Sequence, residues 1–202
     1  YQNRYIYLVS GWHDLGNVNL VQVLDTQSME WAQATPWPGF PVFGHGGGMS
    51  GKRMLICDGV KIHYPADAGP RQFQASSECW LGTIDADNHR RLNWRQIPAH
   101  PGNARYRLAV TANDMQQIVF AGGSANPYNF NGIGYNGEPA EPESLVFSYD
   151  LNEETWTARG NLPQGSMDHR GLLFSGGWYY LAGGMGDSQK TATQVLRFRL
   201  DE

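Results

Sequence analysis

Four short apolar segments of this sequence each end in a pair of small or turn-forming residues. The four pairs are Ser10-Gly11, Asp58-Gly59, Gly122-Gly123 and Gly183-Gly184. An aspartate-to-tryptophan step of six residues follows two of the segments, from Asp25 to Trp31 and from Asp150 to Trp156. A looser copy of this step runs from Asp85 to Trp94. A repeat on this scale predicts an architecture that uses one supersecondary unit several times.

The stretches between these landmarks are short, rich in β-branched and aromatic residues, and bounded by Gly, Asn, Asp or Pro. This pattern is typical of β-strands joined by turns, and no amphipathic helix is evident. We expect strands over residues 5–10, 18–24, 31–34, 45–49, 53–58, 78–84, 93–97, 106–111, 117–121, 144–149, 155–159, 170–174, 178–182 and 193–200.

The composition agrees with a turn-rich all-β protein. The 202 residues include 25 Gly and 11 Pro, and only 17% are charged. The net charge is −4, with no basic stripe, so we expect no nucleic-acid partner. No apolar run reaches the roughly 18 residues that a membrane-spanning helix needs, so we expect no membrane span.

Four strands per repeat, closed by Trp and then Pro, resemble one blade of the kelch family of β-propellers. The motifs that carry the resemblance are the Gly-Gly and Ser-Gly strand ends, Leu24-Asp25 with Trp31, and Tyr149-Asp150 with Trp156. The resemblance implies an all-β, kelch-type propeller of four-stranded antiparallel blades. The implied blades lie at about residues 1–41, 42–102, 103–165 and 166–202, within a single propeller segment over residues 1–202.

The repeats are longer than the roughly 50 residues of a kelch unit. Trp31 and Trp94 are 63 residues apart, and Trp94 and Trp156 are 62 apart. We place the extra length in loops over residues 61–77 and 124–143. The three tryptophans are expected to fill the gaps between adjacent blades as core residues, because a bulky aromatic ring suits that position.

Both terminal copies of the repeat are incomplete. The first begins at what would be the second strand of a blade, and the fourth ends before its outer strand. Since they lack different strands, they cannot complete each other, and open faces and edges would expose apolar surface. We therefore expect about four blades of a larger, six- to eight-bladed propeller, completed by another chain or by a segment outside these residues.

The two cysteines, Cys57 and Cys79, fall in neighbouring strands of one repeat. Buried cysteine often packs as a small hydrophobe, which favours two free thiols. The alternative is a cross-strand disulfide, which would fit an exported protein. Neither cysteine belongs to a Cys-x-x-Cys pair, so structural zinc is not expected, and we expect no cofactor. A periplasmic or secreted location is favoured over a cytoplasmic one.

Basic residues recur near the start of three copies. His45 precedes Asp58 by 13 residues, Arg170 precedes Gly183 by 13, and Arg107 precedes Gly122 by 15. This spacing puts the three in nearly the same phase of the repeat, with Arg105 and His169 beside them. Converging guanidinium groups would bind an anion, and a carboxylate suits their fork of donors. The alternative is that these residues make structural bonds between blades.

The insertion over residues 124–143 is a second candidate site. Its aromatic residues Tyr128, Phe130 and Tyr135 would stack on sugar rings, and Asn126, Asn129 and Asn131 would bond hydroxyl groups. Long loops on rigid scaffolds often carry function. The alternative is a packed surface loop in which Asn and Gly serve only the turns.

We interpret the chain as a ligand-binding module for a glycan or a protein. Bacterial sialate mutarotases and the galactose oxidase propeller are kelch-type proteins of similar architecture. The first resemblance implies an alternative, a carbohydrate-active enzyme that acts on an anionic sugar, with His169, Arg107 and Arg170 as candidate catalytic residues. For galactose oxidase, no matching copper-binding constellation is found. A second alternative is an assembly propeller with no small-molecule ligand.

Overall fold

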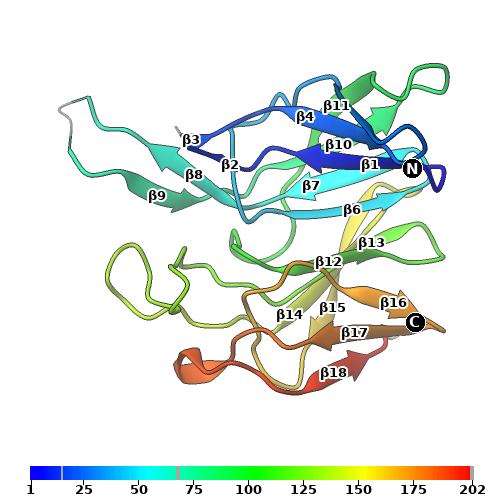
Figure 1. Ribbon diagram of the computed structural model, residues 1–202. Helices are drawn as coiled ribbons and strands as arrows, with labels where there is room; N and C mark the ends of the chain where they lie inside the picture. Colours follow the sequence, from blue (N-terminus) through cyan, green and yellow to red (C-terminus); the bar gives the residue numbers. More distant parts are fainter. Residues whose placement is uncertain (15, 67–68, 201–202) are drawn as a thin grey trace.

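The computed structural model describes residues 1–14, 16–66 and 69–200 and is all-β (Figure 1). Four antiparallel sheets of three, four, four and three strands follow one another along the chain, with two further two-stranded ribbons. Within the described residues the only helical element is a 3₁₀ turn at Asp187–Gln189. No helix in this part of the chain is long and apolar enough to cross a membrane.

Each sheet is contributed by one copy of the sequence repeat. The first sheet has the order β1-β4-β5, the second β6-β7-β10-β11, the third β12-β13-β14-β15 and the fourth β16-β17-β18. The strands of the first two sheets are β1 (Tyr5–Val9), β4 (Val21–Asp25), β5 (Glu30–Gln33), β6 (Gly46–Ser50), β7 (Arg53–Cys57), β10 (Cys79–Ile84) and β11 (Leu92–Ile97). The strands of the other two are β12 (Ala109–Ala112), β13 (Gln117–Ala121), β14 (Leu145–Asp150), β15 (Thr155–Asn161), β16 (Leu173–Ser175), β17 (Trp178–Ala182) and β18 (Val195–Phe198).

The two ribbons were not expected from the sequence. One pairs β2 (Trp12–His13) with β3 (Gly16–Asn17), and the other pairs β8 (Val60–His63) with β9 (Gln72–Ala75). Residues 61–77 therefore contain a hairpin that projects from the second sheet, where only a loop was predicted (Figure 1). Segment 124–143 is ordered by isolated bridges, Tyr128 to Gly134 and Ile133 to Pro139.

The repeated residue pair has a common backbone conformation. Both members of all four pairs have positive φ, from 56° at Ser10 to 116° at Gly11. This left-handed geometry ends β1, β7, β13 and β17 abruptly, and glycine adopts it without a steric penalty. At Gly184 a Cβ would lie only 2.3 Å from the His169 ring, so close approach also requires glycine there.

The core lies between the sheets, as expected for stacked blades. Val21 and Met54 belong to the cluster between the first two sheets, Leu55 and Phe147 to the next, and Val119 and Leu181 to the last. Trp94 and Trp156 pack against two of these clusters. Trp31 does not, because 54% of its surface is exposed on the outer face of the first sheet, so its expected core position is wrong.

Cys57 and Cys79 form a disulfide, so the favoured prediction of free thiols is wrong. The two residues are directly opposite one another on β7 and β10. Directly opposed residues of antiparallel strands bring their side chains together, which gives the two sulfur atoms the proximity they need.

Candidate functional site

A cavity of about 460 Å³ lies where the inner strands of the second, third and fourth sheets begin. Its polar and aromatic lining comes from Phe43, His45, Tyr106, Arg107, His169 and Arg170. The structure thus brings together four residues singled out in the sequence, His45, Arg107, His169 and Arg170. We call this cavity the central pocket.

Backbone bridges define which residues of the three sheets are equivalent. Phe43, Tyr106 and Met167 each form a bridge to the residue that directly follows the repeated pair of the same sheet. The next residues, Gly44, Arg107 and Asp168, are therefore equivalent, and all three have positive φ, at 63°, 54° and 63°. His45 corresponds to Leu108 and His169, so the sequence-based phase of Arg107 and Arg170 was off by one residue each. The side chains still converge because adjacent positions line the same cavity.

An acidic residue links the two arginines of the central pocket. Arg107 Nη1 lies 2.7 Å from Asp168 Oδ1, and Arg170 Nη1 lies 3.2 Å from the same oxygen. The Arg107 guanidinium also lies over the rings of Tyr106 and Tyr128, at 4.8 and 5.3 Å from their centroids. Two positive charges and one negative charge leave this cluster with an excess of one positive charge.

The two histidines of the pocket are uncharged at neutral pH. Burial lowers the pKa of His45 to about 4 and that of His169 to about 4. Ser166 Oγ lies 2.9 Å from His169 Nε2, whereas His45 Nδ1 is buried with no hydrogen-bond partner among the described residues. The pocket therefore combines permanent guanidinium charge with neutral imidazole groups that donate or accept hydrogen bonds.

Two buried tyrosines, Tyr106 and Tyr128, add hydroxyl groups to the polar groups around the pocket. The hydroxyl groups of Tyr106 and Tyr128 have no hydrogen-bond partner within the described residues. Burial raises the pKa of both phenols, so both remain protonated and able to donate. Tyr128 is completely buried, with its ring 5.1 Å from that of Tyr106, so it supports the pocket rather than stacking on a ligand as predicted.

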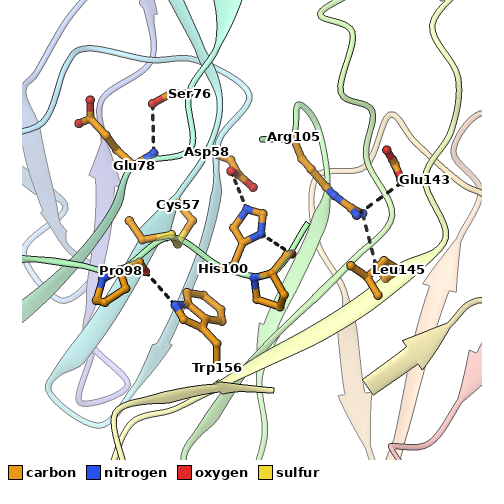
Figure 2. Close-up of polar contacts among 12 residues, drawn as sticks. Cys57, Asp58, Ser76, Glu78, Pro98, His100, Arg105, Glu143, Leu145 and Trp156 are labelled. Atoms are coloured by element: carbon orange, nitrogen blue, oxygen red, sulfur yellow. Dashed lines mark hydrogen bonds and ion pairs between the residues drawn. A yellow bond between two sulfur atoms is a disulfide. The ribbon is translucent and has the colours of Figure 1, made fainter. Parts of the chain in front are cut away.

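Arg105 does not line the central pocket. It is only 1% exposed, donates to the carbonyl of Gly122 at 2.8 Å and lies 3.6 Å from the carboxylate of Glu143. Figure 2 shows its guanidinium directed to Glu143 and to the carbonyl of Leu145. This contact pattern matches the structural alternative that the sequence left open for the arginines.

A buried ion pair between Asp58 and His100 was missed in the sequence. Figure 2 shows the contact between His100 Nε2 and Asp58 Oδ1, which lie 2.8 Å apart. Both side chains are almost completely buried. His100 Nδ1 lies 2.8 Å from the carbonyl of Pro101, so both ring nitrogens face oxygen acceptors. Burial opposes the charge on His100, but the hydrogen bond and the negative charge of Asp58, together with the carbonyl of Pro101, raise the pKa of the imidazole. The two residues are 42 positions apart, and no motif links them.

Two other predicted site residues, Asn129 and Tyr135, lie away from the central pocket. Asn129 is exposed, and its backbone N–H donates to the carbonyl of Ile133. The Tyr135 ring stacks on Phe73 of the β8–β9 hairpin, with centroids 3.7 Å apart. The described residues contain no group of three or more His, Cys, Asp and Glu side chains that could hold a metal ion.

Comparison with known proteins gives a match at the level of fold. The chain matches no protein-family model and no curated protein. The solved structure of YjhT is similar to it, with a TM-score of 0.70 and 15% sequence identity, over 92% of this chain and 51% of that one. The chain thus spans about half the length of YjhT. The four sheets and this likeness together establish an all-β, propeller-like fold.

Proposed function

We propose that this chain is a ligand-binding module whose central pocket takes a small anionic ligand, such as an acidic sugar unit of a glycan. The observation that carries the proposal is the convergence of Arg107, Arg170, His45 and His169 on one cavity of about 460 Å³. Cavities of roughly 300–1,000 Å³ are typical of small-molecule sites.

The charges of the pocket favour a carboxylate. Arg107 is already oriented by Asp168, and Arg170 is 70% exposed and able to turn toward a ligand. A planar guanidinium binds a carboxylate through two parallel hydrogen bonds. The wall of the pocket also holds His45 Nδ1 and the Tyr106 hydroxyl, which are buried with no hydrogen-bond partner among the described residues.

A glycan array that includes sialosides and uronic acids tests this proposal. We expect binding to acidic sugars and a loss of about tenfold or more in affinity in Arg170→Glu, because a charge-assisted hydrogen bond is replaced by repulsion. Arg91→Glu is the matched control, since Arg91 is exposed and lines no part of the central pocket. Absence of binding to every acidic sugar, or an equal loss in the control, would contradict the proposal.

The neutral histidines favour a second candidate function, an enzyme of the sialate mutarotase type. A histidine with a pKa of about 4 is uncharged at neutral pH and able to accept a proton, and His169 lies beside both arginines. Exchange between the anomers of N-acetylneuraminate, followed by NMR, tests this candidate. Acceleration by the chain that is lost in His169→Gln would support it, and an unchanged exchange rate would reject it.

We also propose that further kelch-type blades complete the propeller. β7, β13 and β17 each have strands on both edges, whereas β1 pairs only with β4 among the described strands. A cavity of about 390 Å³, lined in part by Leu8, Gly47 and Met49, follows the open edge of β1. Native mass measurement tests this proposal, and a stable native monomer of 22.5 kDa would contradict it.

We also propose a periplasmic or secreted location for this protein. The argument is the Cys57–Cys79 disulfide, because disulfides persist mainly in oxidising compartments. Fractionation of the source cells followed by thiol labelling of the native protein tests this location. Recovery of the protein in the cytosol with both thiols reduced would contradict it.

A further inference from the structure

A second polar cleft lies between two insertions of the repeat, the β8–β9 hairpin and segment 124–143. It has a volume of about 260 Å³. Its lining consists of Arg71, Gln72, Phe73, Asn126, Pro127, Tyr135 and Asn136. Figure 1 shows that both insertions project on the same side of the molecule, away from the two chain ends. We call this cavity the insertion cleft.

We propose that the insertion cleft binds a neutral sugar unit, independently of the anion site proposed for the central pocket. The volume is below that of typical sites for drug-sized ligands, which suits a single monosaccharide. Aromatic rings beside side-chain amides supply the two kinds of contact that a sugar needs, apolar contact for its C–H face and hydrogen bonds for its hydroxyl groups.

One wall of the cleft is held rigidly. The Phe73 and Tyr135 rings stack at an interplanar angle of 11°, which joins the hairpin to segment 124–143. Asn126 Nδ2 donates to Asn136 Oδ1 and to the carbonyl of Glu138, both at 3.2 Å. These bonds fix the segment before any ligand binds, and a preorganised site loses less entropy on binding.

Other polar groups of the cleft are left for a ligand. The side-chain amide of Gln72 and the hydroxyl of Tyr135 have no hydrogen-bond partner within residues 1–14, 16–66 and 69–200. Arg71 forms no ion pair in the same part of the chain, and its guanidinium lies 5.8 Å from the centroid of the Trp12 ring. An amide both donates and accepts, which matches a hydroxyl group better than it matches an anion.

The insertion cleft and the central pocket are separate cavities with different lining residues. Phe43 lines the central pocket, and its ring centroid lies 6.4 Å from that of Phe73, which lines the insertion cleft. The two sites therefore have no lining residue in common and are linked by one aromatic contact. Binding in the insertion cleft does not need the charges of the central pocket, so the two proposals can be tested separately.

Neutral tetrasaccharides provide the test. Cellotetraose, maltotetraose, mannotetraose and chitotetraose would be titrated into the full chain and followed by saturation-transfer NMR and calorimetry. We expect at least one to bind, with affinity about tenfold lower in Tyr135→Ala and about fivefold lower in Gln72→Ala. Because Gln72 is exposed, its loss does not threaten folding.

Phe130→Ala is the matched control. Phe130 belongs to the same segment and is 89% exposed, yet it does not line the cleft, so its removal should change affinity less than about twofold. The proposal is overturned if none of the four sugars binds, or if binding is unchanged in both cleft variants. Loss of neutral-sugar binding in Arg170→Glu would place the sugar in the central pocket and would also overturn it.

Discussion

Trp156 and Trp31 occupy the same position of the repeat but lie in opposite environments. Trp156 packs between the second and third sheets, where its indole N–H donates to the carbonyl of Pro98 at 2.9 Å. Trp31 pairs with Leu24 on the first sheet and has no neighbouring sheet on its outer side in the described structure. The same six-residue step from Asp to Trp thus gives a core tryptophan only where a second sheet covers the ring.

The interface around Trp156 also holds the buried Asp58–His100 pair, and the largest effect on the free energy of unfolding is expected there. Asp58→Ala leaves the buried His100 without its partner, and breaking a buried ion pair costs about 3–5 kcal/mol. Urea denaturation would measure the loss in the free energy of unfolding. The double variant Asp58→Ala/His100→Ala should lose less than the sum of the single losses, because the pair acts as a unit. Strict additivity would contradict this coupling.

Removal of the interface tryptophan should have the next largest effect. Trp156→Ala removes aromatic contacts with Phe120, Phe147 and Tyr149 and should lower the free energy of unfolding by about 3 kcal/mol. Urea denaturation of both proteins at the same pH measures the difference. Trp156→Phe keeps most of the apolar contact and loses the bond to Pro98, so it should cost less than half as much. An equal cost for both variants would contradict packing as the main contribution.

A further effect is expected at His45, which directly precedes β6 and whose ring nitrogen Nδ1 is buried. Its pKa of about 4 lies below the roughly 6.5 of an exposed histidine, so the unfolded chain binds the proton more tightly. The contribution of this group to stability is therefore full above about pH 6.5 and falls as the pH drops toward 4, by about 3 kcal/mol. Thermal unfolding from pH 4 to 8 would measure it. Because His169 titrates in the same range, His45→Gln should reduce the slope of this part of the profile by about half, and an unchanged slope would contradict the lowered pKa of His45.

The contrast between Trp156 and Trp31 also shows how much of the structure can be predicted from the sequence. The strands of the four sheets and their sharp ends follow from local patterns of residues, and these expectations agree with the structure. The β8–β9 hairpin, the Asp58–His100 pair and the disulfide depend on contacts between residues 9 to 42 positions apart, which no local pattern encodes. The convergence of His45, Arg107 and Arg170 could be anticipated because repetition turns sequence phase into position in space, although a one-residue error in phase remained.

The smallest effect on the free energy of unfolding is expected at Trp31, and it tests the comparison between Trp31 and Trp156 most directly. Because the ring is 54% exposed, Trp31→Ala should lower the free energy of unfolding by about 1 kcal/mol or less. The measurement is urea denaturation beside Trp156→Ala, repeated over a hundredfold range of protein concentration. A loss near that of Trp156→Ala would mean that something covers the outer face of the first sheet in solution. If that loss also grew with concentration, the cover would be a second copy of the chain, since only association is concentration-dependent. A small loss at every concentration would instead leave the row of Ile6, Leu24 and Trp31 open in this chain and available to the further blades proposed to complete the fold.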